Sequence, residues 1–300
     1  MWTTELFEFP FYELYFYFLI YSFLGWALES LFVSATNKEW VNRGFIRGPF
    51  CPIYGTGAVL VILALTPAMG NLAWVFLGGV LIATVVEYFI SLFLEKLFHA
   101  TWWDYSEMPL NLQGRICLRR SLEWGALSVV MLTVIQPPIA DFVRWIPRTI
   151  AEFAGTAILI YLIADTSVTV MNILQLKEKI EKLEEARLGL RERMESVKIF
   201  EARKELLEYL EGLPISEAMA NLREKIEEHT GQMRQLKAEE RLRFEYFLSE
   251  IKERLERRQR ILKKSTLTER RLYKAFPRLH FEKYNEAFKA FKEEFFKIEK

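Results

Sequence analysis

The first 172 residues of the chain alternate between long apolar runs and short polar segments. A helix that crosses the hydrocarbon core of a bilayer needs roughly 20 predominantly apolar residues. Five runs approach that length, and they cover residues 12–35, 50–66, 72–97, 118–136 and 150–172. The second run is short and contains Pro52, so we expect it to be tilted or partly re-entrant. The pattern predicts a bundle of about five transmembrane helices.

Beyond Asn172 the apolar pattern changes to alternating spacings of three and four residues, which is typical of a coiled coil. The apolar positions are Ile173, Leu176, Ile180, Leu183, Leu190, Met194 and Val197. We expect the last membrane helix to continue into this segment. A break at 212–214 and a second long helix over 216–262 indicate an antiparallel hairpin, and a dimeric coiled coil is the alternative.

The tail carries an aromatic stripe at helical spacing, formed by Phe281, Tyr284, Phe288, Phe291 and Phe295. It either packs onto the preceding helices or docks on a membrane or a partner. The whole pattern predicts an all-α protein in two domains. Residues 1–172 form a transmembrane domain, and residues 173–300 form a charged helical hairpin or coiled coil.

Charge separates the same two parts and suggests an orientation. The chain has nine Lys and Arg residues up to Asn172, and thirty-one after it. Basic residues gather in the loop after the first run and around the loop after the third, whereas Arg144 and Arg148 in the fourth loop are the exception. Because positive residues favour the cytoplasmic side, we expect the N-terminus outside and the C-terminal domain in the cytoplasm, as in a bacterial inner membrane protein. Glu5 and Glu8 stand where a cleaved signal peptide would carry basic residues, so we do not expect such a peptide.

Several function classes find no support in the sequence. Lys and Arg are interleaved with acidic residues, so no basic stripe for nucleic acid emerges. Neither GxxxxGK[ST] nor GxGxxG occurs, and HExxH, CxxC and GxSxG are also absent. We therefore expect no ATPase motif, metal or other cofactor in this chain. Cys51 and Cys117 are expected to be small buried residues.

Two polar segments between the apolar runs carry the candidate chemistry. Arginine binds phosphate and carboxylate groups bidentately, and acidic residues can orient it or carry protons. Glu87 near the middle of the third run should face the bundle interior, with Glu95 two turns later on the same face. The candidate substrate-binding residues are Trp26, Glu29, Arg43, Arg47, Tyr54, Glu87, Glu95, His99, Trp103, Asp104, Tyr105, Asn111 and Arg115. The alternative is a set of ion pairs that only lock the helices together, because loop lengths do not establish that the arginines converge.

Several unusual motifs recur in order between about residues 12 and 140. They are YSFLGWALES, NRGFIRGPFCPIYG, the segment from Glu87 to Glu95, FHATWWDY and NLQGRICLRRSLEWG. This part of the chain resembles the putative ABC transporter permease family, type IV or CmpB-like, of bacterial multi-pass membrane proteins. The resemblance implies a permease that works with a separate ATPase subunit. It does not extend to the coiled coil.

The leading hypothesis is therefore a permease-like membrane subunit with a cytoplasmic-side polar site for an anionic or amphiphilic substrate. A second hypothesis is a membrane-anchored scaffold or signalling protein that works through residues 173–300, by a protein partner or a second copy of the chain. A third is a membrane enzyme acting on lipid headgroups, with Glu29, Glu95, His99 or Asp104 as acid or base.

Overall fold

The computed structural model of the chain describes residues 5–6, 9–196 and 267–281, with scattered single positions between 246 and 292. Four helices in these ranges are long and apolar enough to cross a membrane. They are α1 (Phe11–Asn37), α3 (Leu72–Phe98), the helix formed by α4 and α5 (Leu118–Trp145), and the part of α6 up to Glu185. The predicted membrane-embedded helical part is thus present, with four full-length spans.

The second predicted span, over residues 50–66, is a shorter helix. Helix α2 (Pro52–Leu65) has 14 residues and is followed by a 3₁₀ turn, η1 (Thr66–Ala68). At 1.5 Å per residue, α2 extends about 21 Å, which is less than the roughly 30 Å of a hydrocarbon core. Pro52 stands in the first turn, where the absence of its N–H has no consequence for the helix.

The span predicted over 118–136 runs further, to Trp145. Helix α4 (Leu118–Val130) passes through a π-helical turn, η2 (Met131–Ile135), into α5 (Gln136–Trp145). Pro137 and Pro138 lie in the first turn of α5, and the π turn lets the helix continue through them. Arg144, which the charge pattern placed in the fourth loop, therefore lies in a helix.

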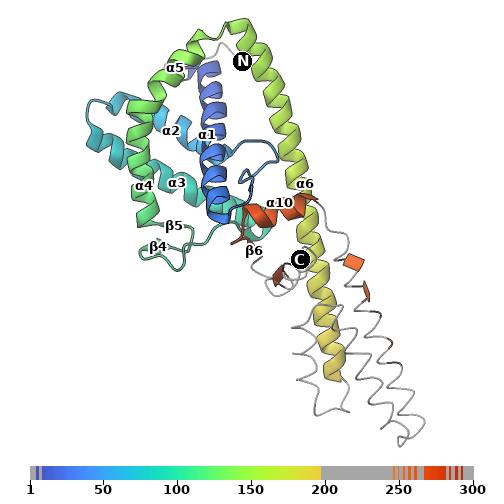
Figure 1. The fold of residues 1–300 in the computed structure, drawn as a ribbon. Helices are drawn as coiled ribbons and strands as arrows, with labels where there is room; N and C mark the ends of the chain where they lie inside the picture. Colours follow the sequence, from blue (N-terminus) through green and yellow to red (C-terminus); the bar gives the residue numbers. More distant parts are fainter. Residues whose placement is uncertain are drawn as a thin grey trace, which may run out of the picture. The chain divides into compact units, whose positions relative to one another are not determined.

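Small residues bring the membrane helices close together. Helix α3 packs along α4, α1 packs along α2, and α5 returns to α1 (Figure 1). A Cβ atom at Gly79 of α3 would lie 2.5 Å from the Cβ of Ser128 on α4, so only glycine fits at this crossing. The hydroxyl of Thr84 donates to that of Ser121 across the same pair of helices at 2.7 Å.

A buried carboxylate links α1 to α5 at the start of α1. Glu13 is buried in the first turn of α1, and the hydroxyl of Tyr17 donates to its Oε2 at 2.8 Å. Arg144 Nε lies 3.4 Å from Glu13 Oε1. The hydroxyl of Tyr21 donates to Oε1 of Gln136 at 2.9 Å and adds a second link between α1 and α5.

Helix α6 (Arg148–Ser196) runs unbroken from the last membrane span into the charged part of the chain, as the sequence predicts. Ile173, Leu176, Ile180 and Leu183 at the coiled-coil positions are buried. The break at 212–214, the helix over 216–262 apart from isolated positions, and Phe291 and Phe295 lie outside the described residues. The hairpin and the coiled-coil dimer therefore stay predictions.

The chain divides into two compact units. The first contains residues up to Ile173 together with residues 270–280, and the second contains Leu174–Glu269 and Phe281–Lys300. Within the second unit, Phe281 and Phe288 of the aromatic stripe are buried, with ring centroids 5.1 Å apart. Lys179 of α6 pairs with Glu269 at 3.2 Å. Of the described residues of the stripe, Phe281 and Phe288 are therefore packed, whereas Tyr284 is half-buried.

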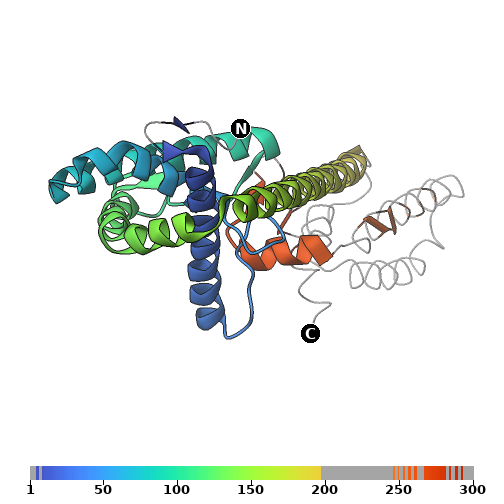
Figure 2. The ribbon, with the colours of Figure 1, turned by 90° about the horizontal axis from the view of Figure 1, so that it is seen from above.

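Short strands and one further helix complete the described structure. Strands β1 (Glu5–Leu6) and β2 (Phe9–Pro10) pair antiparallel before α1, and β4 (Asn111–Leu112) and β5 (Ile116–Cys117) form a hairpin before α4. Strand β3 is Ala100–Thr101, helix α10 is Leu267–Ala275 and strand β6 is His280–Phe281. Residues 270–275 of α10 lie beside the loop that follows α1, as both views show (Figures 1 and 2).

Candidate functional site

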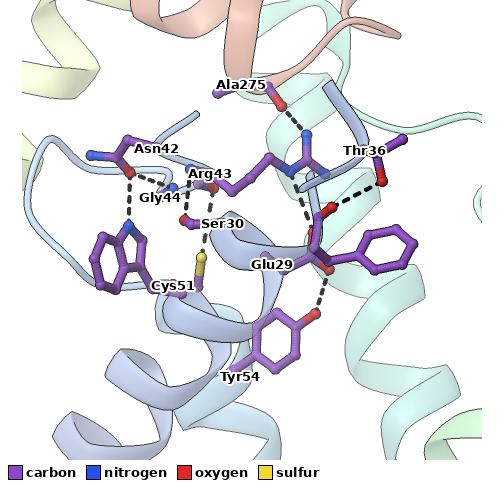
Figure 3. A network of polar contacts seen from close by, with 11 residues as sticks. Glu29, Ser30, Thr36, Asn42, Arg43, Gly44, Cys51, Tyr54 and Ala275 are labelled. Atoms are coloured by element: carbon purple, nitrogen blue, oxygen red, sulfur yellow. Dashed lines mark hydrogen bonds and ion pairs between the residues drawn. The ribbon is translucent and has the colours of Figure 1, made fainter. Parts of the chain in front are cut away.

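Loop A, residues 38–51 between α1 and α2, is organised around Asn42. The Asn42 Oδ1 atom accepts from the Gly44 amide at 2.8 Å (Figure 3) and from the Trp26 indole N–H at 2.8 Å. Its Nδ2 donates to the Arg47 carbonyl at 2.9 Å. One side chain therefore closes the turn and joins it to α1. Trp26 takes part through this bond rather than as an isolated interfacial ring.

Arg43 and Glu29 form the ion pair of loop A. Arg43 Nε lies 3.3 Å from Glu29 Oε2, and the Tyr54 hydroxyl donates to Glu29 Oε1 at 2.6 Å (Figure 3). The Arg43 amide donates to Oγ of Ser30 at 3.1 Å. A Cβ at Gly25 would lie 2.3 Å from Cγ of Tyr54, so the absent side chain leaves room for the tyrosine ring. Three predicted residues from α1, loop A and α2 thus meet.

Asp165 anchors loop A to α6, although it was not among the candidate residues. Its carboxylate accepts from the Arg47 amide at 3.2 Å, the Gly48 amide at 2.8 Å and the Tyr161 hydroxyl at 3.2 Å. The sequence signal was an acidic residue in an apolar run, which is costly in a membrane helix without partners. Arg47 joins the site through its backbone, and its side chain is exposed.

Cys51 closes loop A as a buried, free thiol. Its Sγ donates to the Arg43 carbonyl at 3.6 Å. Burial, with a further contribution from the Glu29 charge, raises the pKa of this thiol to about 12. Cys117 is also buried and free. The described residues contain no group of three or more His, Cys, Asp or Glu side chains that could hold a metal ion.

Loop B, residues 99–117 between α3 and α4, is held mainly by its own residues. Asn111 Oδ1 accepts from the Gly114 amide at 3.1 Å, and its Nδ2 donates to the Met108 carbonyl at 2.8 Å. The Tyr105 amide donates to the Gly114 carbonyl at 2.8 Å. The Trp103 indole donates to the Arg115 carbonyl at 2.9 Å. Loop B is therefore a closed hairpin.

Asp104 caps a turn within loop B. Its Oδ1 accepts from the Ser106 amide at 2.8 Å. Partial burial acts to raise the pKa of Asp104, but the Ser106 hydrogen bonds and nearby cationic groups outweigh it and hold the pKa below 3.8. Asp104 is therefore a carboxylate at neutral pH and serves as an acceptor.

Both α3 carboxylates meet loop B, on the common face that the spacing predicts. Arg115 binds Glu95 bidentately, with Nη2 at 2.6 Å from Oε2 and 2.8 Å from Oε1. The guanidinium also lies over the Tyr88 ring, 5.8 Å from its centroid. Two turns earlier, Glu87 is buried and its Oε1 accepts from the Tyr105 hydroxyl at 3.1 Å.

The two arginine–carboxylate pairs are separate rather than one cluster. Rings of Phe45 in loop A, Phe98 at the end of α3 and Trp102 in loop B pack together, with the Trp102 centroid 5.3 Å from Phe45 and 6.0 Å from Phe98. A second set of rings connects the polar groups, because Tyr54 stacks edge-on with Trp124 at 5.5 Å. The Trp124 side chain also interacts with the Glu87 carboxylate.

His99 is a second candidate residue that contributes through its backbone. It ends α3 in the left-handed conformation, with φ of 53°, and its amide donates to the Glu95 carbonyl at 2.7 Å. Its side chain is exposed. The sequence spacing to Glu95 reflects a helix terminus here rather than a shared ligand-binding face.

Residues 270–280, which no sequence motif connects with the polar loops, also reach this site. Arg271 donates to three successive loop A carbonyls, those of Gly44 and Phe45 at 2.9 Å and that of Ile46. Burial lowers the pKa of Arg271, and the Asp165 charge acts in the opposite direction. In the sequence, no spacing distinguishes Arg271 from the other arginines of the charged half.

Comparison with curated proteins and with solved structures finds no match for this chain. A family model described as putative ABC-transporter type IV matches residues 16–170, which is more than half of the chain. The match includes α1 to α5, both polar loops and the part of α6 that carries Asp165. The chain therefore belongs to the putative ABC-transporter type IV family, as its loop motifs predict.

Proposed function

We propose that this chain is the membrane subunit of a transporter, and that loops A and B bind an anionic or amphiphilic substrate at the cytoplasmic side. The family and the four membrane helices support a transport role. The sequence has no Walker motif, so ATP hydrolysis would come from a separate ATPase subunit. The distribution of Lys and Arg supports an inner membrane location with the N-terminus outside.

The observation that carries the proposal is the repeated arginine–carboxylate pair at the ends of α1 and α3. The pairs are only partly exposed, with side chains 23% and 31% exposed for Arg43 and Glu29, and 14% and 17% for Arg115 and Glu95. A guanidinium in such a setting exchanges one oxyanion for another at little cost, because the fork geometry suits carboxylate and phosphate alike. Each pair is thus a preformed site whose internal carboxylate an external anion can replace.

A row of polar and aromatic groups leads from loop A into the membrane region. It passes from Arg43 and Glu29 through Tyr54 and Trp124 to Glu87. Glu87 lies beyond the midpoint of α3, where a carboxylate is costly unless it faces partners. This row provides successive acceptors and donors for a headgroup that moves from the loop toward the interior of the bundle.

The proposal is tested first by native mass spectrometry of the protein extracted gently from its own membrane. We expect a retained anion or anionic phospholipid and a co-purifying ATPase subunit. The complex is then placed in sealed liposomes, and ATP-dependent flux of the retained molecule is measured. Sealed liposomes that contain the complex and show no ATP-dependent flux would contradict the proposal.

Matched arginine variants locate the substrate site. Arg43→Gln and Arg115→Gln should each lower flux about tenfold or more, because each loses a charged hydrogen-bonding group. The control is Arg119→Gln, whose side chain is 72% exposed and pairs with Glu123 on the same helix. Equal flux in all three variants would show that transport does not depend on the arginines of these loops.

A further inference from the structure

Arg271 makes an unusually specific set of contacts with loop A. Its guanidinium donates to the carbonyls of Gly44, Phe45 and Ile46, which are consecutive in the chain. Arginine presents its donors in a rigid planar fork, so three successive carbonyls can be bound only by a loop folded around it. Removing a cation from water is costly unless such partners replace the water. The contact is therefore selective for this loop conformation.

The neighbouring residues extend the contact over both loops. Lys274 pairs with Glu39 of loop A at 3.3 Å. The Phe276 ring meets Trp102 of loop B edge-on at 4.9 Å, and Arg278 donates to the Asp104 carbonyl at 3.0 Å. Leu272, Ala275 and Leu279 of the segment are buried. Residues 270–280 thus have an apolar side, an anchoring cation and charged flanks that match these loops.

The segment also closes off Arg43. The Arg43 Nη1 atom donates to the Ala275 carbonyl, and its Cζ lies 5.2 Å from the centroid of the Phe276 ring (Figure 3 shows the Ala275 contact). Arg43 Nε is already paired with Glu29. An anion that approaches this guanidinium therefore meets the segment and the internal carboxylate together.

We propose that loops A and B form a docking site for the chain's own residues 270–280, with Arg271 as the anchor, and that Arg43 becomes accessible when this segment leaves. The docking itself is independent of transport. Only the consequence for substrate access rests on the proposed function, in which Arg43 binds the anion.

A cysteine pair tests the docking in the full-length protein in its membrane. Glu39→Cys and Lys274→Cys are combined, because these side chains are partly exposed and paired, whereas the native Cys51 and Cys117 are buried. A mixture of isotopically labelled and unlabelled protein is oxidised, and linked peptides are identified by mass spectrometry. We expect linked peptides of one isotope only. Mixed-isotope pairs would show docking between copies, and absence of the link would show no docking; either result overturns the proposal.

The anchor is tested through the accessibility of Arg43 to phenylglyoxal, an arginine-specific reagent, read out on the peptide that contains it. Arg271→Met should raise the modification rate of Arg43 about tenfold or more. The variant lacks the charged hydrogen bonds from Arg271 to loop A, so loop A opens at a lower free-energy cost. Arg257→Met is the control, because Arg257 lies in the same half of the chain and is exposed. An unchanged rate in Arg271→Met protein with native thermal unfolding would overturn the anchoring role.

A substitute variant and a protection measurement complete the test of the anchor. If Arg271→Met does not fold, Arg271→Lys supplies the test, because a single ammonium cannot bind three carbonyls in the same way. The oxidised cysteine pair should then protect Arg43 from phenylglyoxal relative to the reduced pair, and equal rates would contradict closure. Liposomes without flux but with an intrachain link would refute the transport function and leave the docking intact.

Discussion

Loops A and B present the same chemical group by different means. Each follows a membrane helix and returns an arginine to a carboxylate on that helix, Arg43 to Glu29 and Arg115 to Glu95. Each loop is closed locally by an asparagine, Asn42 in loop A and Asn111 in loop B. Loop A is held in addition by Asp165 and Arg271, which are more than a hundred residues away in the sequence. One arginine site therefore depends on distant contacts as well as a local turn, and the other mainly on its local turn.

The difference makes loop A responsive to distant parts of the chain. A change in α6 or in residues 270–280 acts on the Arg43 pair directly, through the backbone groups that those residues hold. Loop B should keep the Arg115 pair in place through such changes. The comparison is tested most directly by removing a distant partner, then an arginine, then a local turn residue.

The largest effect is expected for Asp165→Ala. The substitution leaves the Arg47 and Gly48 amides without their acceptor and removes a negative charge near the half-buried Arg271. Two hydrogen bonds to a charged acceptor correspond to about 3 kcal/mol or more of unfolding free energy. Unfolding in mixed micelles measures it. The control is Asp141→Ala, since Asp141 is exposed in α5, and similar losses for both would place loop A's anchor elsewhere.

An intermediate effect is expected for Arg115→Met. The largely buried bidentate pair with Glu95 is lost, which should lower the unfolding free energy by about 2 kcal/mol. Arg119→Met removes the exposed pair with Glu123 and should change it by less than about 0.5 kcal/mol. Both are measured by the same unfolding assay. Equal effects would mean that the Arg115 pair is as solvent-screened as a surface pair.

The smallest effects should have opposite signs at two glycines. Gly114 in loop B has φ of 67°, and a Cβ there would lie 2.7 Å from Asp104 Oδ1. Gly114→Ala should therefore destabilise the protein by about 1 kcal/mol or more. Gly57 lies within α2 with no atom within 4 Å of the added Cβ, so Gly57→Ala should stabilise it by about 0.5 kcal/mol. The two thermal unfolding midpoints give the comparison, and a stabilising Gly114→Ala would show that loop B does not need this turn.

The features that the sequence predicted correctly depend on local periodicity. Glu87 and Glu95 share a face because helical spacing requires it, and α6 continues beyond the membrane part because its apolar and charged positions remain helical. In each case the determining contacts are close in the chain.

The features that the sequence did not predict depend on partners far apart in the chain. Asp165 appeared as one acidic residue among hydroxyl groups, and only the fold shows that two loop A amides meet it. No periodicity connects Arg271 to carbonyls about 225 residues earlier. The contact of Phe45 in loop A with Trp102 in loop B likewise follows from helix packing.

The π turn at Met131–Ile135 gives the membrane part a mechanical joint. It lies between α4, which is packed on α3, and α5, which is packed on α1. Pro137 and Pro138 follow it and donate no backbone hydrogen bonds, so bending here breaks fewer bonds than bending elsewhere in the same span. The softest bending mode of the span Leu118–Trp145 should therefore be a hinge that moves the α3–α4 pair, with the Arg115 site, against the α1–α5 pair, with the Arg43 site.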